Sequence, residues 1–164
     1  MRENFPVRSI DDSFASELEN RVVSIAWSPN NLKLAVASAD RSIYLFDENG
    51  AKRDRFSTKP IDPKFGKKSY MVKGIAFSPE STKIAVGQTD CIVYVYKIGE
   101  DWGDKKVICN KFRQSAAVTC LIWPMDGSII TGLADGKVRA ALVKSQKAQT
   151  LYTSDAMTIA LASK

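Results

Sequence analysis

The 164-residue sequence has no histidine, no glycine-rich phosphate loop and no long apolar run. Imidazole is the usual general base near neutral pH and the commonest zinc ligand, so its absence excludes a Ser-His-Asp triad and histidine-bound zinc. Neither GxxxxGK[ST] nor GxGxxG occurs. The neighbouring carboxylates Asp11 and Asp12, like Glu100 and Asp101, point apart on an extended chain. We therefore expect no enzyme, cofactor, metal site or small-molecule substrate.

The apolar stretches are too short for the bilayer, which needs about 20 residues for a spanning helix. The opening MRENFPVRSIDD also lacks the apolar run of a secretory signal. Three cysteines, an odd number without a CxxC pair, argue against a disulfide framework: Cys91, Cys109 and Cys120. The sequence thus predicts a soluble intracellular domain with buried, reduced thiols.

One sequence motif is repeated along the chain. VVSIAWSPNNLKLAVASADRSIYLF (22–46) aligns without a gap with VKGIAFSPESTKIAVGQTDCIVYVY (72–96). VTCLIWPMDGSIITGLADGKVRAAL (118–142) is a third copy that lacks one residue between Trp123 and Asp135, and AMTIALASK (156–164) begins a fourth. A repeat of this kind indicates a unit that buries its apolar faces only against its neighbours.

Each copy has the pattern of antiparallel strands. Larger apolar residues alternate in LKLAVAS and SIYLF, with the period of two typical of a strand. Pro29 and Pro79 follow a serine at the second position of a predicted type I turn. Aspartate recurs in the second turn of each copy, and we interpret these carboxylates as structural turn residues that accept backbone N–H bonds, not as catalytic groups: Asp40, Asp90 and Asp135.

The period and strand content predict an all-β fold, a partial WD40-type β-propeller over residues 1–164. The repeats span approximately 22–57, 72–112 and 118–153, with a partial repeat from 156, which gives about three blades plus the start of a fourth. Outer strands are expected within 51–57 and 105–112, and a long surface loop over 56–70. Propellers close with typically four to eight blades, so we expect a fragment with an uncovered apolar face at its carboxyl end.

Two features modify this propeller pattern. Small residues recur in one strand of successive copies and would let neighbouring sheets approach closely: Ala35, Ala37, Ala85, Gly87 and Gly132. The glycine-histidine dipeptide of the WD40 signature is missing. The positions of its Trp-Asp dipeptide are occupied by Phe46-Asp47, Tyr96-Lys97 and Ala141-Leu142. A hydrogen-bond network through that histidine and tryptophan therefore cannot form. Aromatic packing is expected to replace it in the first two copies.

The stretch from 56 to 112 resembles the amino-terminal propeller of the intraflagellar transport protein 172 family. The most specific pieces are SYMVKG, STKIA, GQTD and YVYKIGEDWGDKKVICNKF. The resemblance implies a non-enzymatic scaffold in intraflagellar transport complex B, with other complex B proteins as partners. It also implies a place in the cilium or flagellum and basal body, on the cytoplasmic side, and a role in cilium assembly and transport along the axoneme.

The candidate contact residues lie in two loops. Residues 52–73 carry eight basic and two acidic side chains, and the lysines of the predicted loop could contact acidic protein or membrane surfaces: Lys59, Lys64, Lys67 and Lys68. Trp102 in GEDWGD is either an interface anchor or packs back onto its own blade. The alternative function is a basic WD40 propeller that binds membranes, like a coat protein, or RNA. Aromatic residues are sparse here, so nucleic acid is the less favoured partner.

Overall fold

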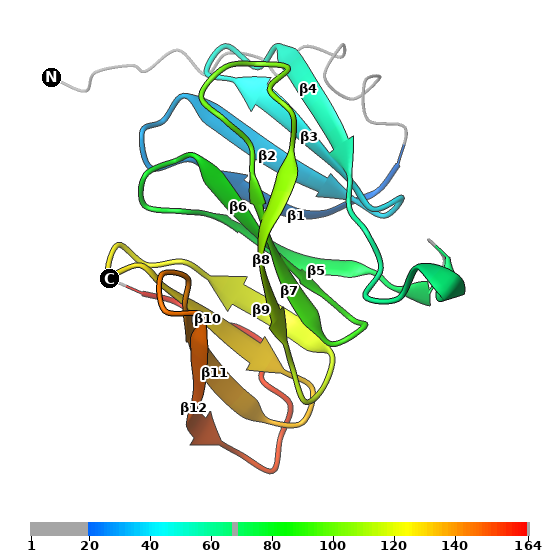
Figure 1. Cartoon of the computed structure of the whole chain (residues 1–164), viewed down its shortest axis with the longest axis vertical. Coiled ribbons are helices and arrows are strands. Elements are labelled where there is room, and N and C mark those ends of the chain that lie inside the picture. The colour runs from blue at the N-terminus through cyan, green and yellow to red at the C-terminus, as the bar shows by residue number, and fades with distance from the viewer. Residues whose placement is uncertain (1–19, 67–68, 164) are drawn as a thin grey trace, which may run out of the picture.

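The computed structural model describes residues 20–66 and 69–163, which form three four-stranded antiparallel sheets (Figure 1). We call these sheets blade 1 (β1–β4), blade 2 (β5–β8) and blade 3 (β9–β12). Strand order within each blade follows the sequence. The strands are β1 Val22–Trp27, β2 Lys33–Ser38, β3 Ser42–Asp47, β4 Lys52–Ser57, β5 Val72–Phe77, β6 Lys83–Gln88, β7 Ile92–Lys97, β8 Val107–Arg113, β9 Val118–Ile122, β10 Ser128–Leu133, β11 Lys137–Leu142 and β12 Lys147–Thr153.

The all-β propeller prediction is confirmed, and the repeat alignment matches the strand register. Ala35 pairs with Leu45 in blade 1, and Ala85 pairs with Val95 at the same position of blade 2. The predicted Ser-Pro turn of the first two copies is also present, since the N–H groups of Asn31 and Ser81 donate to the carbonyls of Ser28 and Ser78, both at 2.8 Å. The predicted outer strands are β4 and β8.

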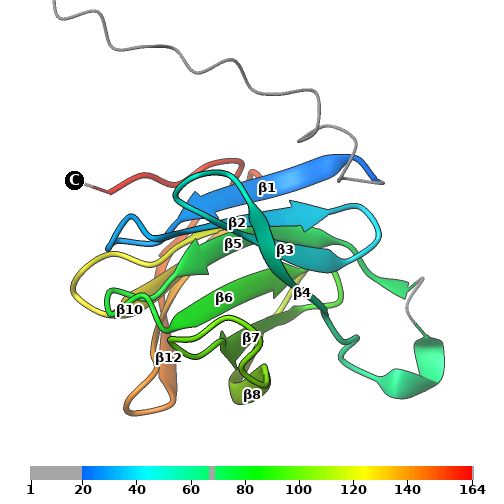
Figure 2. The same ribbon diagram turned by 90° about the horizontal axis from the view of Figure 1, so that it is seen from above.

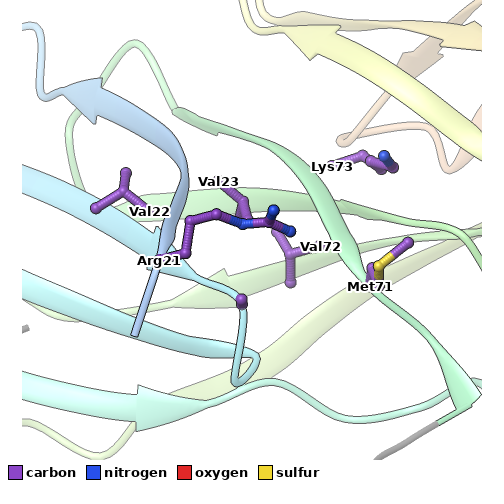
Figure 3. A pocket seen from close by; sticks show the side chains of 7 residues that line it. Arg21, Val22, Val23, Met71, Val72 and Lys73 are labelled. Carbon is purple, nitrogen blue, oxygen red and sulfur yellow. The ribbon is translucent and has the colours of Figure 1, made fainter. Parts of the chain in front are cut away.

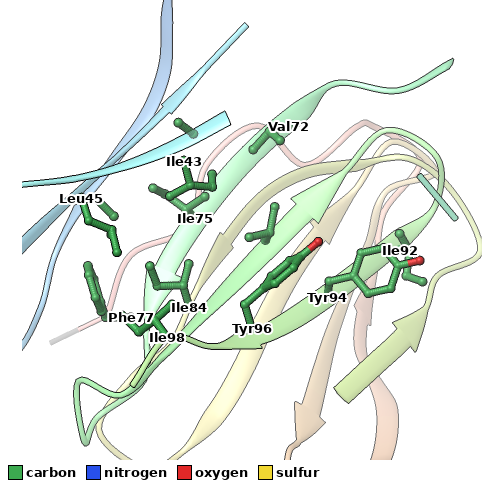
Figure 4. Packing of buried hydrophobic residues seen from close by; sticks show 13 residues of the cluster. Ile43, Leu45, Val72, Ile75, Phe77, Ile84, Ile92, Tyr94, Tyr96 and Ile98 are labelled. Carbon is green, nitrogen blue, oxygen red and sulfur yellow. The ribbon is translucent and has the colours of Figure 1, made fainter. Parts of the chain in front are cut away.

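The blades lie side by side through their first strands, with β5 between β1 and β9 (Figures 1 and 2). A buried apolar cluster joins blades 1 and 2, where Ile43 and Leu45 of β3 face Ile75 and Phe77 of β5 (Figure 4). A second cluster joins blades 2 and 3 and includes Phe112. Each blade therefore covers an apolar face of the next, which stabilises both sheets.

Glycine at position 87 allows blades 2 and 3 to approach closely. A Cβ added there would lie 2.5 Å from Val118 Cγ1 and 2.6 Å from Leu121 Cδ2, both in β9. Gly132 is the equivalent residue of blade 3, and its added Cβ would lie 2.6 Å from Thr158 Cγ2. The small residues thus permit the radial packing that the sequence pattern indicates.

Residue Thr158 occupies the place beside blade 3 that β9 occupies beside blade 2. Its N–H donates to the Leu133 carbonyl at 3.3 Å, and its carbonyl accepts a bond of 2.5 Å from Thr119 Oγ1. Residues 154–163 form no strand among the described residues. The expected fourth repeat is therefore represented here by an extended segment without a sheet.

Aromatic side chains fill the Trp-Asp positions of the first two blades. Phe46 is fully buried and Tyr96 almost so, and the Tyr96 ring lies 5.1 Å from that of Phe56. Asp47 keeps a turn role, because its Oδ1 accepts the N–H groups of Asn49 and Ala51 at 3.0 and 2.9 Å.

Exposed apolar side chains lie on both outer blades, blade 1 and blade 3, and not only at the carboxyl end. Phe56, Phe112 and Tyr152 hold equivalent register positions in β4, β8 and β12. The first two pack against the following blade, whereas Tyr152 is 64% exposed. On blade 1, Ile25 and Trp27 are 62% and 53% exposed.

The predictions for the surface loop and the cysteines need correction. The loop begins after β4, contains a 3-10 turn, η1 (Pro63–Phe65), and buries Thr58 and Tyr70. All three cysteines are free, but Cys109 is exposed, because β8 is the outer strand of its sheet and alternate side chains face solvent. Among the described residues, no helix has the length and apolar character needed to cross a bilayer.

Candidate interaction surface

Two of the three repeated aspartates hold the turn that contains them. Asp40 Oδ1 accepts the Ser42 N–H at 3.0 Å, and Asp135 Oδ1 accepts the Lys137 N–H at 3.3 Å. Burial alone would raise the pKa of Asp40, but hydrogen bonds from its neighbouring serines and the Arg55 charge outweigh it and lower that pKa. Bonds from Lys137 and a serine hydroxyl lower the pKa of Asp135 to about 2. Both carboxylates are therefore ionised at neutral pH.

Asp90 lies in the equivalent turn but bonds a distant segment. Its Oδ2 accepts the Ile61 N–H at 2.7 Å, and its buried Oδ1 has no partner among the described residues. Gln88 Nε2 and Tyr94 Oη donate to the carbonyls of Lys59 and Pro60 at 3.2 and 3.1 Å. Burial raises the pKa of Asp90. This carboxylate thus fastens the segment that links blades 1 and 2.

The basic stretch carries less free charge than its sequence suggests. Arg53 Nε lies 2.8 Å from Asp47 Oδ2, and Arg55 pairs with Asp40 Oδ2 at 3.0 Å. Of the predicted contact lysines, Lys59 and Lys64 are exposed. Lys67 and Lys68 lie outside the described residues.

Trp102 lies at the junction of blades 1 and 2. Lys33 Nζ from β2 sits 4.9 Å from the centroid of the indole ring. The same ammonium donates to the carbonyls of Gly99 and Glu100 at 3.2 and 2.7 Å. The half-buried tryptophan also packs on the cluster that the two blades share. The structure therefore places it in an interblade contact as well as beside its own blade.

A second contact strengthens this junction. Asp54 of β4 forms an ion pair with Lys106 and accepts the Gly103 N–H at 3.0 Å. Burial would raise the pKa of Asp54, but these bonds outweigh it and lower the pKa. We call the contacts of Lys33 and Asp54 with residues 98–106 the interblade clamp. This clamp was not predicted from the sequence, because no short sequence motif indicates which side chains of different blades come into contact.

A shallow pocket of about 260 Å³ opens at the start of β1 and β5 (Figure 3). Valines form part of its wall, and the Arg21 side chain, from the residue before β1, and the Lys73 side chain of β5 also line it. No group of three or more potential metal ligands occurs in the described part of the chain. The pocket thus combines an apolar wall with two basic side chains.

Comparison with known proteins decides the family. The model for "WD domain, G-beta repeat" matches residues 6–47, 62–97 and 106–140. The chain belongs to the WD40 repeat family. Its blades also superpose on the crystal structure of Saccharomyces cerevisiae Sqt1 with a TM-score of 0.71. That match covers 91% of this chain and 40% of Sqt1 at 16% identity, so it supports the WD40 fold alone.

Relatives with closer sequences are intraflagellar transport proteins. This WD40 chain is 62% identical over 141 residues to intraflagellar transport protein 172 homolog of Rattus norvegicus. It is 46% identical over 149 residues to intraflagellar transport protein 172 of Chlamydomonas reinhardtii. The matches cover 86% and 87% of the chain but 8% of each relative. They confirm the resemblance that residues 56–112 indicate.

Proposed function

We propose that this chain is a non-enzymatic interaction module of intraflagellar transport complex B, acting in cilium or flagellum assembly and in transport along the axoneme. The observation that carries the proposal is the 62% identity to an intraflagellar transport protein 172 homolog on a WD40 fold. WD40 blades present loops and strand edges on a rigid frame, an arrangement suited to docking other proteins.

Partners would be other complex B proteins, met in the cilium or flagellum and at the basal body on the cytoplasmic side. The interblade clamp supports this role, because it fixes the 98–106 loop of blade 2 against strands β2 and β4 of blade 1. Preorganised loops lose less conformational entropy when a partner binds. The alternative, a basic propeller that binds membranes or RNA, draws less support, because Arg53 and Arg55 are paired with carboxylates of blade 1.

A chimera tests the proposal. The matching segment of Chlamydomonas reinhardtii intraflagellar transport protein 172 is replaced by this chain and expressed in cells lacking the endogenous protein. We expect the chimera to enter flagella, restore their assembly and coprecipitate complex B proteins. A second chimera with the matching blades of Sqt1, which share the fold at 16% identity, should fail.

Two outcomes would contradict the proposal. One is a chimera that accumulates normally but stays in the cell body and coprecipitates no complex B protein. The other is equal rescue by the Sqt1 chimera, because any propeller would then suffice. Binding to anionic liposomes or RNA that disappears as salt rises would favour the alternative, since salt screens polybasic contacts.

A further inference from the structure

A basic pocket lies between the outer strands of blades 1 and 2. Its cavity volume is about 420 Å³, within the range of about 300–1,000 Å³ typical of ligand sites. Phe56 at the end of β4 and Tyr96 of β7 line it, with their ring centroids 5.1 Å apart. Four lysines from the segment after β4, from the 98–106 loop and from β8 complete the lining: Lys59, Lys105, Lys106 and Lys111.

Only one of these ammonium groups has a carboxylate partner among the described residues. Lys106 pairs with Asp54 in the interblade clamp, and its side chain is 9% exposed. Lys59, Lys105 and Lys111 are exposed, and no described acidic side chain lies within 4 Å of their Nζ atoms. The rim of the pocket therefore carries an excess positive charge available to a ligand.

The shape of the pocket favours a protein segment over a membrane surface. Tyr96 is almost fully buried and Phe56 is half-buried, so the aromatic wall is recessed beneath the lysines. Amphipathic segments that insert into membranes project apolar side chains below their basic groups. A recess with an aromatic wall and a basic rim instead fits one apolar side chain flanked by carboxylates.

We propose that this pocket binds an acidic peptide segment of a partner protein, with an aromatic or aliphatic side chain inserted against Phe56 and Tyr96. Carboxylates on either side of that residue contact Lys59, Lys105 and Lys111. The inference deepens the proposed function and rests on it for the identity of the partner. The peptide chemistry, however, can be tested with the isolated chain.

The test is fluorescence anisotropy of a fluorescein-labelled peptide, DEEFDEED, titrated with the 164-residue chain. We expect saturable binding, weakened at least about tenfold by the pair Lys105→Glu and Lys111→Glu. The control pair, Lys144→Glu and Lys147→Glu, makes the same charge change on exposed lysines of blade 3 and should weaken binding less than about twofold. The peptide DEEADEED should bind about fivefold more weakly, since it lacks the inserted ring.

Several results would overturn the proposal. One is that DEEFDEED shows no saturable binding. The others are that the two lysine-pair variants lose the same affinity for it, or that DEEFDEED and DEEADEED bind with equal affinity. Phosphatidylserine vesicles test the membrane alternative. Binding to these vesicles but not to DEEFDEED would assign the pocket to lipid if the Lys105→Glu and Lys111→Glu pair abolishes the vesicle binding. Circular dichroism checks that both variants fold. Peptide binding by a chain whose chimera fails in flagella would retain the pocket and reject the proposed function.

Discussion

Replacing Lys33 by methionine should loosen the junction between blades 1 and 2. Lys33 is 7% exposed, and its ammonium donates to two carbonyls of the 98–106 loop while lying over Trp102. Methionine keeps most of the apolar stem but removes the charge and both hydrogen bonds. The loop then loses its main attachment to blade 1 apart from the contacts of Asp54.

The expected cost follows from those contacts. Hydrogen bonds from a charged donor contribute about 1.5–3 kcal/mol each, before the cost of burying the charge is subtracted. Burial and the nearby Lys106 lower the pKa of Lys33, so burying the charge offsets part of this contribution. We therefore expect the free energy of unfolding to fall by about 2 kcal/mol, or the Tm by about 4–8 °C for a chain of this size.

Lys83 supplies the control, because it holds the same repeat position in blade 2. Its Nζ pairs with the exposed Glu80, three residues away, and such surface pairs contribute little. Lys83→Met should cost less than about 0.5 kcal/mol. Urea unfolding monitored by circular dichroism measures both variants, and hydrogen exchange should show faster exchange of residues 98–106 in Lys33→Met alone. Equal losses of stability in the two variants would refute the clamp.

Three further predictions test other parts of the structure. Gly87→Ala should lower the free energy of unfolding by about 1–3 kcal/mol in thermal melts, because its Cβ would overlap Val118 and Leu121; an unchanged Tm would contradict the close approach of blades 2 and 3. Asp90→Asn should gain stability relative to the parent as pH rises from about 4 to 7 in urea titrations, because the raised pKa makes the native state bind its proton more tightly than the unfolded chain. A gain independent of pH would argue against a buried carboxylate. In thiol titration with a disulfide reagent, Cys109 should react fastest, and Cys109→Ser should remove the fast phase; a fast phase that persists would contradict its exposure.

Local sequence pattern was sufficient to predict the blades. Alternation in LKLAVAS and the Ser28-Pro29 turn depend on interactions within a few residues, so they can be identified without tertiary information. The register of successive copies follows from the same pattern, because one face of each strand must be buried.

Side-chain contacts between blades could not be predicted in the same way. Lys33 and Glu100 are 67 residues apart, and Lys33 holds the same repeat position as Lys83, which makes a surface ion pair. Asp90 likewise matches Asp40 in sequence, yet bonds the Ile61 N–H instead of its own turn. For Asp90 the difference arises from residues 59–61, which only the folded chain brings beside blade 2.

The most direct measurement of the central claim is cross-linking mass spectrometry of the chimera isolated from flagella. An amine-reactive reagent joins lysines that lie close together, within the chain or between proteins. If this segment acts by docking proteins, lysines at the outer rim of blades 1 and 2 should link to other intraflagellar transport proteins. Links from the rest of the chimera but none from this segment, beyond those inside the chain, would contradict an interaction role.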